Sequence, residues 1–71
     1  MIDLHPVQSS NIQMVGYDPN TKELHVLFHS GASIYVYQQV PDDEYEAFVS
    51  ADSLGRHFNQ HIKNEYQFTR R

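Results

Sequence analysis

Alternating apolar and polar residues predict β-strands in the first half of the chain. In Glu23–His29 every second residue is large and apolar, and in Ile34–Gln39 two tyrosines alternate with other residues in the same way. A period of two places successive side chains on opposite faces of a strand. An earlier apolar segment, Ile12–Tyr17, alternates less regularly, and its internal Gly16 indicates a bulge or the close approach of another element. We therefore predict three strands before residue 40.

The period changes after Pro41, where two helices are predicted. Pro41 suits a helix start, and the three carboxylates that follow it suit the positive end of the helix dipole. The first helix ends near Ala51 and carries an apolar stripe at i, i+3 and i+4, formed by Tyr45, Phe48 and Val49. Asp52 or Ser53 caps the second helix, which stops near Asn64 and carries a stripe at i, i+4 and i+8, formed by Leu54, Phe58 and Ile62.

The predicted architecture is a single α+β domain over residues 1–71, of the order βββαα. Three strands form an antiparallel meander, and the two helices pack on one of its faces. Residues 1–8 are predicted to be an N-terminal arm, and residues 66–71 a tail whose aromatic residues fold back. A domain of 71 residues buries only about 60% of its unfolded surface, so a partner or a second copy would add stability.

A two-residue turn at Ser30-Gly31 fixes how the second and third strands pair. Val26 then lies opposite Tyr35, and directly opposed residues share a face. The face with the larger side chains is the predicted core face and consists of Leu24, Val26, Phe28, Tyr35 and Tyr37. The other, outer face consists of His25, Leu27, His29, Ile34 and Val36. A change of one residue in the turn would exchange these faces.

Composition excludes several functional classes. The chain has no cysteine, so it has no disulfide, thiol chemistry or cysteine zinc site. Neither a signal peptide nor an apolar run of membrane-spanning length is present, so we expect a cytoplasmic protein that binds no membrane. A chain this short is not expected to enclose a substrate cavity, and no small-molecule substrate or cofactor is predicted.

Catalytic and metal-binding patterns are weak. No nucleophile elbow or phosphate-binding glycine loop occurs, and the carboxylates of residues 42–44 are explained by their place at a helix start, so we expect a protein that is not an enzyme. His57 and His61 have the i, i+4 spacing of two metal ligands, but no third ligand completes the pattern. We therefore predict no metal site.

Charge is distributed unevenly within a net charge of −4. Residues 1–52 carry one lysine against eight carboxylates, whereas residues 53–71 carry four cations and one carboxylate. The residues that make up this basic concentration are Arg56, His57, Gln60, Lys63, Asn64, Arg70 and Arg71. On a regular helix Arg56, Gln60, Lys63 and Asn64 share one side, and such a stripe suits a phosphate backbone. A solvated helix face explains the same pattern equally well.

The order and spacing of many residues resemble the KTSC domain over about residues 7–68. The matching positions are Val7, Ser9, Ser10, Ile12, Gly16, Tyr17, Asp18, Leu24, Val26, Phe28, Gly31, Tyr35, Val36, Tyr37, Val40, Pro41, Tyr45, Ala51, Asp52, Ser53, Gly55, Phe58, Asn59, Ile62 and Tyr66. This domain extends the C-terminus of some lysyl-tRNA synthetases and also occurs as small bacterial and phage proteins. The resemblance implies the α+β fold and a role in RNA binding. Val36 departs from the family pattern, in which that position is often basic or polar.

Two hypotheses about function follow. The first is an RNA-binding accessory module that acts through the basic second helix and tail. The alternative is a module for protein interaction or self-association that uses the outer sheet face. The resemblance favours the first hypothesis, whereas the acidic total charge and the apolar outer face favour the second.

Overall fold

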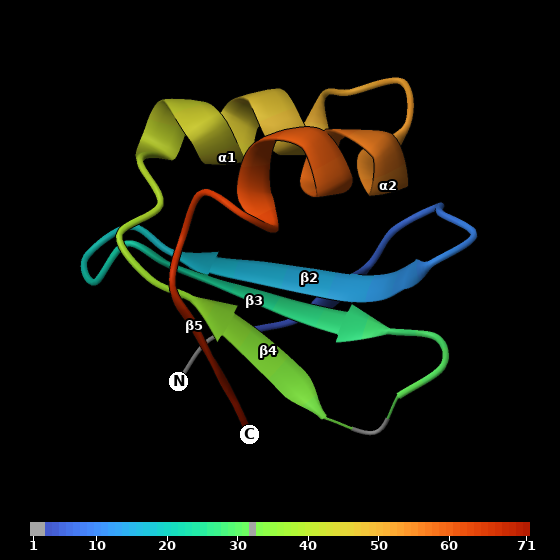
Figure 1. The fold of residues 1–71 in the computed structure, drawn as a ribbon, viewed down its shortest axis with the longest axis horizontal. Coiled ribbons are helices and arrows are strands. Elements are labelled where there is room, and N and C mark those ends of the chain that lie inside the picture. The colour runs from blue at the N-terminus through green and yellow to red at the C-terminus, as the bar shows by residue number, and fades with distance from the viewer. Residues whose placement is uncertain (1–2, 32) are drawn as a thin grey trace.

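The computed structural model describes residues 3–31 and 33–71 as a sheet with helices on one side (Figure 1). The described strands form one antiparallel sheet in the order β1-β2-β3-β4-β5. Their bounds are β1 His5–Pro6, β2 Ile12–Asp18, β3 Glu23–Phe28, β4 Ile34–Tyr37 and β5 Phe68–Arg70. Helix α1 (Asp42–Val49), helix α2 (Leu54–His57) and the π-helical turn η1 (Phe58–Ile62) lie between β4 and β5. The α+β class and the helices on one face are confirmed.

The pairing of β3 with β4 follows the predicted register. Leu24 lies opposite Tyr37, and Val26 opposite Tyr35. The connection is longer than the predicted two residues, because the strands stop at Phe28 and resume at Ile34. The pairing register is nevertheless the predicted one. Gly31 has no positive φ, and its N–H donates to the Phe28 carbonyl oxygen (3.3 Å).

The prediction of only three strands is wrong, because both ends of the chain add an edge strand. In the N-terminal arm His5 pairs with Val15, and in the tail Arg70 pairs with Tyr35. The residues of β1 and β5 are exposed. Such strands are held by backbone hydrogen bonds and bury no side chains. Their sequences therefore show no alternation of apolar and polar residues that would predict a strand.

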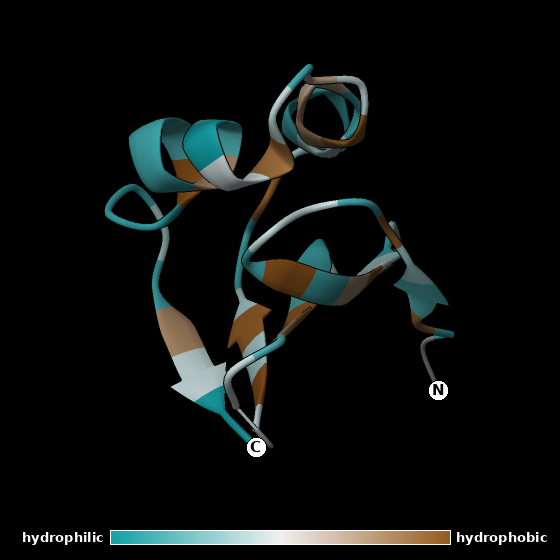
Figure 2. Cartoon of the chain, turned by 90° about the vertical axis from the view of Figure 1, so that its right-hand side faces the viewer, coloured by the Kyte–Doolittle hydropathy of each residue, from teal (hydrophilic) through white to brown (hydrophobic). Residues whose placement is uncertain are grey.

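The irregularity of β2 lies at a different place from the predicted one. Ile12 pairs with Phe28 and Met14 with Leu27, so the extra residue of the bulge falls between Ile12 and Met14. Gly16 pairs regularly with His25 and is buried. Figure 2 shows apolar residues in brown and polar residues in teal along the strands of the sheet.

The helices begin where the sequence indicates. Pro41 is the N-terminal cap residue of α1. The Ser53 hydroxyl accepts a hydrogen bond from the Arg56 N–H (3.3 Å) at the start of α2. The second helix then departs from prediction, because its last turn is a π turn, in which the Lys63 N–H donates to the Phe58 carbonyl oxygen five residues earlier (2.8 Å).

The core lies between the helices and the sheet. Its buried residues include the predicted apolar stripe of α2 and η1 and the predicted core positions Leu24, Val26 and Tyr37. Phe28 and Tyr35 are half-buried and pack against this cluster. The tyrosines of β4 therefore belong to the core side of the sheet, as the register predicts.

The outer face of the sheet contains a buried residue although no helix covers this face. Val36 is fully buried (0% exposed), although it lies on the face away from the helices, between His25 on β3 and Thr69 on β5. The added strand β5 gives Val36 a neighbour on each side. The prediction of a three-stranded sheet made β4 an edge strand and left this residue open.

Candidate nucleic-acid interface

A groove of about 510 Å³ lies between the second helix and the strand ends of the core face. Its aromatic lining comes from β3, β4, η1 and β5 and consists of Phe28, Tyr35, Tyr37, Phe58 and Phe68. Polar residues from the loops and helix, among them Asn11, Asn59, Lys63 and Asn64, complete the lining. Of the described residues that line this aromatic groove, none is a carboxylate. It is therefore a neutral to basic site on an acidic chain.

The aromatic rings form a connected floor and wall. Tyr37 lies 5.2 Å from both Phe58 and Phe68, measured between ring centroids. Tyr35 lies 5.4 Å from Phe28 and 5.5 Å from Phe68. Tyr37 (3% exposed) and Phe58 are buried and form the floor, whereas Phe68 is half-exposed (50%) and forms a wall. Burial raises the pKa of Tyr37, so its hydroxyl stays protonated at neutral pH.

Two of the seven predicted basic-site residues line this groove, and a third lies on the same face of the sheet. Lys63 and Asn64 line it directly. Arg70 lies opposite Tyr35 across the β4–β5 pair, and therefore on the same face of the sheet. These three side chains come from two parts of the chain, and the pairing of β5 with β4 brings the parts together.

The other four predicted residues lie elsewhere. His57 faces α1, where its Nε2 donates to Glu44 Oε2 (2.8 Å). Arg56 and Gln60 line a separate hollow of about 180 Å³ that also includes Asp52. Arg71 follows Arg70 and so points to the outer face, where it exchanges two backbone hydrogen bonds with Ile34 (2.8 and 3.0 Å).

The π turn changes which residues of the second helix share a side. In an α-helix Asn59 and Asn64, five residues apart, would lie about 140° apart around the axis. The π turn closes over five residues, so this angle narrows. Asn59, Lys63 and Asn64 then line one groove together, while Arg56 and Gln60 remain on a different side.

The predicted protein-contact residues are also divided. Leu27 and Ile34 are half-buried on the outer face, and Val36 is buried there. His29 lies past the end of β3 and lines the aromatic groove instead. Its Nε2 donates to the Ser9 carbonyl oxygen (3.1 Å).

His25 is the most constrained polar residue of the outer face. Its Nε2 is buried and has no hydrogen-bond partner within residues 3–31 and 33–71. The Glu23 carboxylate lies 3.8 Å away, beyond hydrogen-bond distance. Burial lowers the pKa of His25, and the positive charge of Arg71 lowers it further, while Glu23 acts in the opposite direction.

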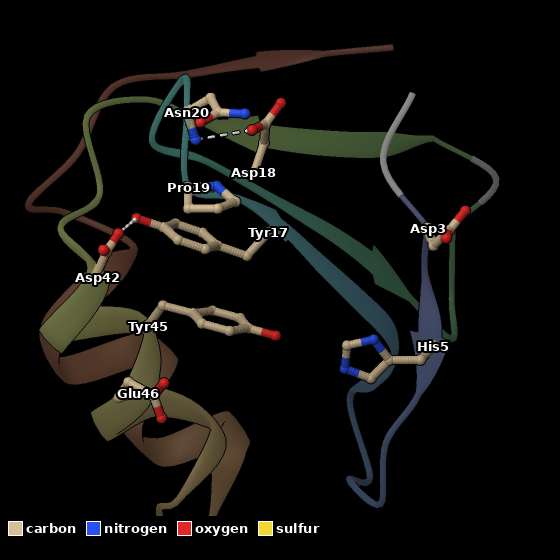
Figure 3. A pocket seen from close by; sticks show the side chains of 9 residues that line it. All are labelled: Asp3, His5, Tyr17, Asp18, Pro19, Asn20, Asp42, Tyr45 and Glu46. Carbon is tan, nitrogen blue, oxygen red and sulfur yellow. Dashed lines mark hydrogen bonds between the residues drawn. The ribbon is translucent and has the colours of Figure 1, made fainter.

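A second, larger hollow of about 750 Å³ is acidic (Figure 3). Asp3, Asp18, Asp42 and Glu46 line it, together with His5 from β1. The rings of Tyr17 and Tyr45 stack there, with centroids 4.5 Å apart and planes 9° apart. Its four carboxylates would repel a phosphate backbone, so it does not suit RNA.

Hydrogen bonds at the edge of the acidic hollow join the sheet to α1. The Tyr17 hydroxyl lies within hydrogen-bond distance of the Val40 carbonyl oxygen and of Asp42 Oδ1 (2.8 Å). Lys22 Nζ lies 2.9 Å from the same Asp42 oxygen. Burial and the Asp42 carboxylate raise the pKa of Tyr17, while Lys22 and Tyr17 lower the pKa of Asp42. These groups are thus explained by a structural connection.

Metal-binding clusters and membrane-spanning helices are absent from the described residues. Within the described residues, no set of three or more histidine, aspartate or glutamate side chains is arranged to hold a metal ion. His57 and His61 do lie close, with ring centroids 4.6 Å apart. Of the helices in the described part of the chain, none is long and apolar enough to cross a membrane.

The fold defines a small α+β domain in which two helices cover one face of a five-stranded antiparallel sheet. The chain belongs to the KTSC domain family, whose model matches residues 8–66. The crystal structure of a KTSC domain protein from Yersinia pestis is similar, with a TM-score of 0.95 and 34% identity over 100% of this chain and 99% of that one.

Two relatives support the same assignment. An uncharacterized protein from Stutzerimonas stutzeri (strain A1501) is 48% identical over 60 residues, which cover 84% of this chain and 83% of that protein. A protein from Tsukamurella paurometabola is 36% identical over 64 residues, covering 90% and 94% of the two chains. The resemblance noted in the sequence is thereby confirmed as family membership.

Sequence reasoning missed the aromatic groove itself. Its floor residues have the hydrophobic pattern of a core, and two of them, Tyr37 and Phe58, are core residues. One residue in the sequence could have indicated the groove: Phe68, an aromatic residue in a polar, basic tail. Its exposure depends on β5, which the sequence did not reveal.

Proposed function

We propose that this KTSC domain is an RNA-binding accessory module that binds through the groove side of its second helix and tail. The observation that supports this most strongly is that Lys63 and Asn64 line a groove without carboxylates on a chain with a net charge of −4, and that Arg70 lies on the groove side of the sheet. Opposite charges attract the phosphates of RNA, and side-chain amides bind sugars and bases. The role is one of binding, without catalysis.

Salt dependence tests this proposal quantitatively. Two phosphate contacts, from Lys63 and Arg70, give a slope of log affinity against log salt of about −1.4 for a single strand. Affinity for a fluorescent decauridylate should then fall roughly sevenfold between 50 and 200 mM salt. Lys63→Gln should weaken binding at low salt and reduce the slope by about 0.7. Absence of binding at low salt would refute the proposal.

The tail offers a matched control. Arg70→Glu and Arg71→Glu make the same charge change at adjacent positions, but only Arg70 lies on the groove side. At 150 mM salt, where screening acts over about 8 Å, Arg70→Glu should weaken binding more than Arg71→Glu. Equal effects would mean that the tail attracts RNA through its total charge alone.

The outer sheet face supports a second candidate, a contact with another protein or a second copy. Half-buried apolar residues, Met14, Leu27 and Ile34, lie there without a covering helix. Val36, at the centre of the predicted patch, contributes no surface. The remaining apolar area supports this candidate less than the groove supports RNA.

A further inference from the structure

The aromatic groove has the lining expected of a site for a flat ring. Its floor is made of the buried rings of Tyr37 and Phe58, and its walls are the more exposed rings of Tyr35 and Phe68. The volume of about 510 Å³ lies in the range of small-ligand sites. Tyr35 and Phe68 are inclined to one another by 42°, so they do not stack on each other, and half of the Phe68 surface is exposed.

Side-chain amides are the main polar groups that line the aromatic groove. Side-chain amides of Asn11, Asn59 and Asn64 line the groove, and none of these amides takes part in the side-chain hydrogen bonds of the described residues. An amide both donates and accepts, as the edge of a nucleobase does. Lys63 adds a cation beside these amides, and the carboxylates that would repel a phosphate are absent from the described lining.

We propose that the aromatic groove binds one unpaired base of a single-stranded RNA. The base stacks on Phe68 and Tyr35, its edge meets the amides of Asn59 and Asn64, and its phosphates meet Lys63 and Arg70. This inference rests on the proposed RNA binding and adds that the module selects single strands. A paired base inside a duplex cannot enter, because its faces are covered by its neighbours.

The experiment separates stacking from phosphate attraction. The full chain is titrated with decauridylate, decaadenylate, the duplex that these two strands form, and a ten-unit abasic ribose-phosphate strand, each at 50 and 200 mM salt. Phe68→Leu removes a stacking ring but retains an apolar side chain on an exposed strand. Tyr45→Leu is the matched control, because it removes a half-buried ring from the acidic hollow. Circular dichroism verifies that each variant is folded.

The expected result is that Phe68→Leu selectively loses affinity for single-stranded RNA. Phe68→Leu should weaken single-strand binding roughly 5- to 150-fold, the range for one stacked base, without changing the salt slope. The duplex and the abasic strand should bind the wild type about as weakly as decauridylate binds Phe68→Leu. Tyr45→Leu should bind like the wild type. NMR titration should shift the side-chain amide signals of Asn59 and Asn64.

Three results would overturn the inference, and they differ from each other. If Phe68→Leu binds like the wild type while Lys63→Gln loses affinity, RNA binding stands and the base site fails. If no oligonucleotide binds at 50 mM salt, both proposals fail. If N-acetyltryptophanamide, a probe for an aromatic side chain of a protein, shifts the groove signals and the oligonucleotides do not, the groove serves a protein ligand instead.

Discussion

Substitution of Val36 provides a stringent test of the closed outer face. Val36 is fully buried on the side of the sheet that no helix covers. Val36→Ala removes two buried methyl groups, which is worth about 1.6 kcal/mol at 0.8 kcal/mol per group. The cavity left behind raises the cost to roughly 2–3 kcal/mol. At about 0.05–0.15 kcal/mol per residue, this is a large fraction of the stability of so small a domain.

Urea denaturation followed by tyrosine fluorescence or circular dichroism measures this loss. With a slope near 1 kcal/mol/M for a small domain, the midpoint should fall by about 2 M. Val36→Thr preserves the branched shape and strand preference, so any loss in that variant reports the burial of a hydroxyl. Val49→Ala serves as the matched control, because Val49 is 36% exposed on α1 and alanine favours the helix.

An open outer face would give a different result. Val36→Ala would then change the free energy of unfolding by less than about 0.5 kcal/mol, as surface substitutions do, and would resemble Val49→Ala. That outcome would refute the burial of Val36 and would restore the outer face as a protein-contact surface. A loss of 2 kcal/mol or more would remove Val36 from that surface.

Three further predictions concern other parts of the chain. Gly55→Ala should raise the unfolding free energy by up to about 1 kcal/mol in urea, because the new Cβ meets two side-chain atoms, the Asn11 amide nitrogen at 3.3 Å and the Ser9 hydroxyl oxygen at 3.8 Å; a decrease would show that Asn11 is held rigidly. Burial lowers the pKa of His25, so stability should be fully present above the ordinary value of about 6.5 and be lost as pH falls through the lower folded value. His25→Leu should reduce this loss between pH 7.5 and 5 in urea titrations, and an unchanged pH dependence would contradict the assignment. Leu27→Glu should leave the mass measured by light scattering unchanged if the outer face makes no self-contact, and a dimer that this substitution dissociates would favour the alternative function.

The sheet register was predictable because it depends on side-chain periodicity. Once Leu24 and Val26 alternate opposite Tyr37 and Tyr35, only one register buries the larger set. The edge strands were not predictable, because β1 has only two residues and β5 only three, all exposed. Their formation depends on unpaired backbone groups of β2 and β4, and these are a property of the folded sheet.

The candidate site was predictable only in part, because two features of the backbone decide it. Helical periodicity placed Lys63 and Asn64 on one stripe with Arg56, but in the structure, where a π turn lies between them, Lys63 and Asn64 line the aromatic groove and Arg56 lines a separate hollow. Strand alternation then separated Arg70 from Arg71. Neither a π turn nor an exposed three-residue strand has a sequence pattern that identifies it, so composition correctly located the basic segment but not its grouping.

The tail strand links the proposed site to local stability. Phe68 lines the groove, and Arg70 lies on the groove side of the sheet, only while β5 is paired, so RNA should bind the paired state and stabilise it. At an RNA concentration 100 times the dissociation constant the gain is about 2.7 kcal/mol, which corresponds to roughly hundredfold slower exchange of amides that open with β5. The Ile34 and Gln38 N–H groups, which donate to Arg71 and Gln67, should show this protection by NMR hydrogen exchange with decauridylate. The Val40 N–H, which donates to Lys22, reports openings away from β5, and a lack of added protection at Ile34 and Gln38 would show that RNA does not bind through the tail.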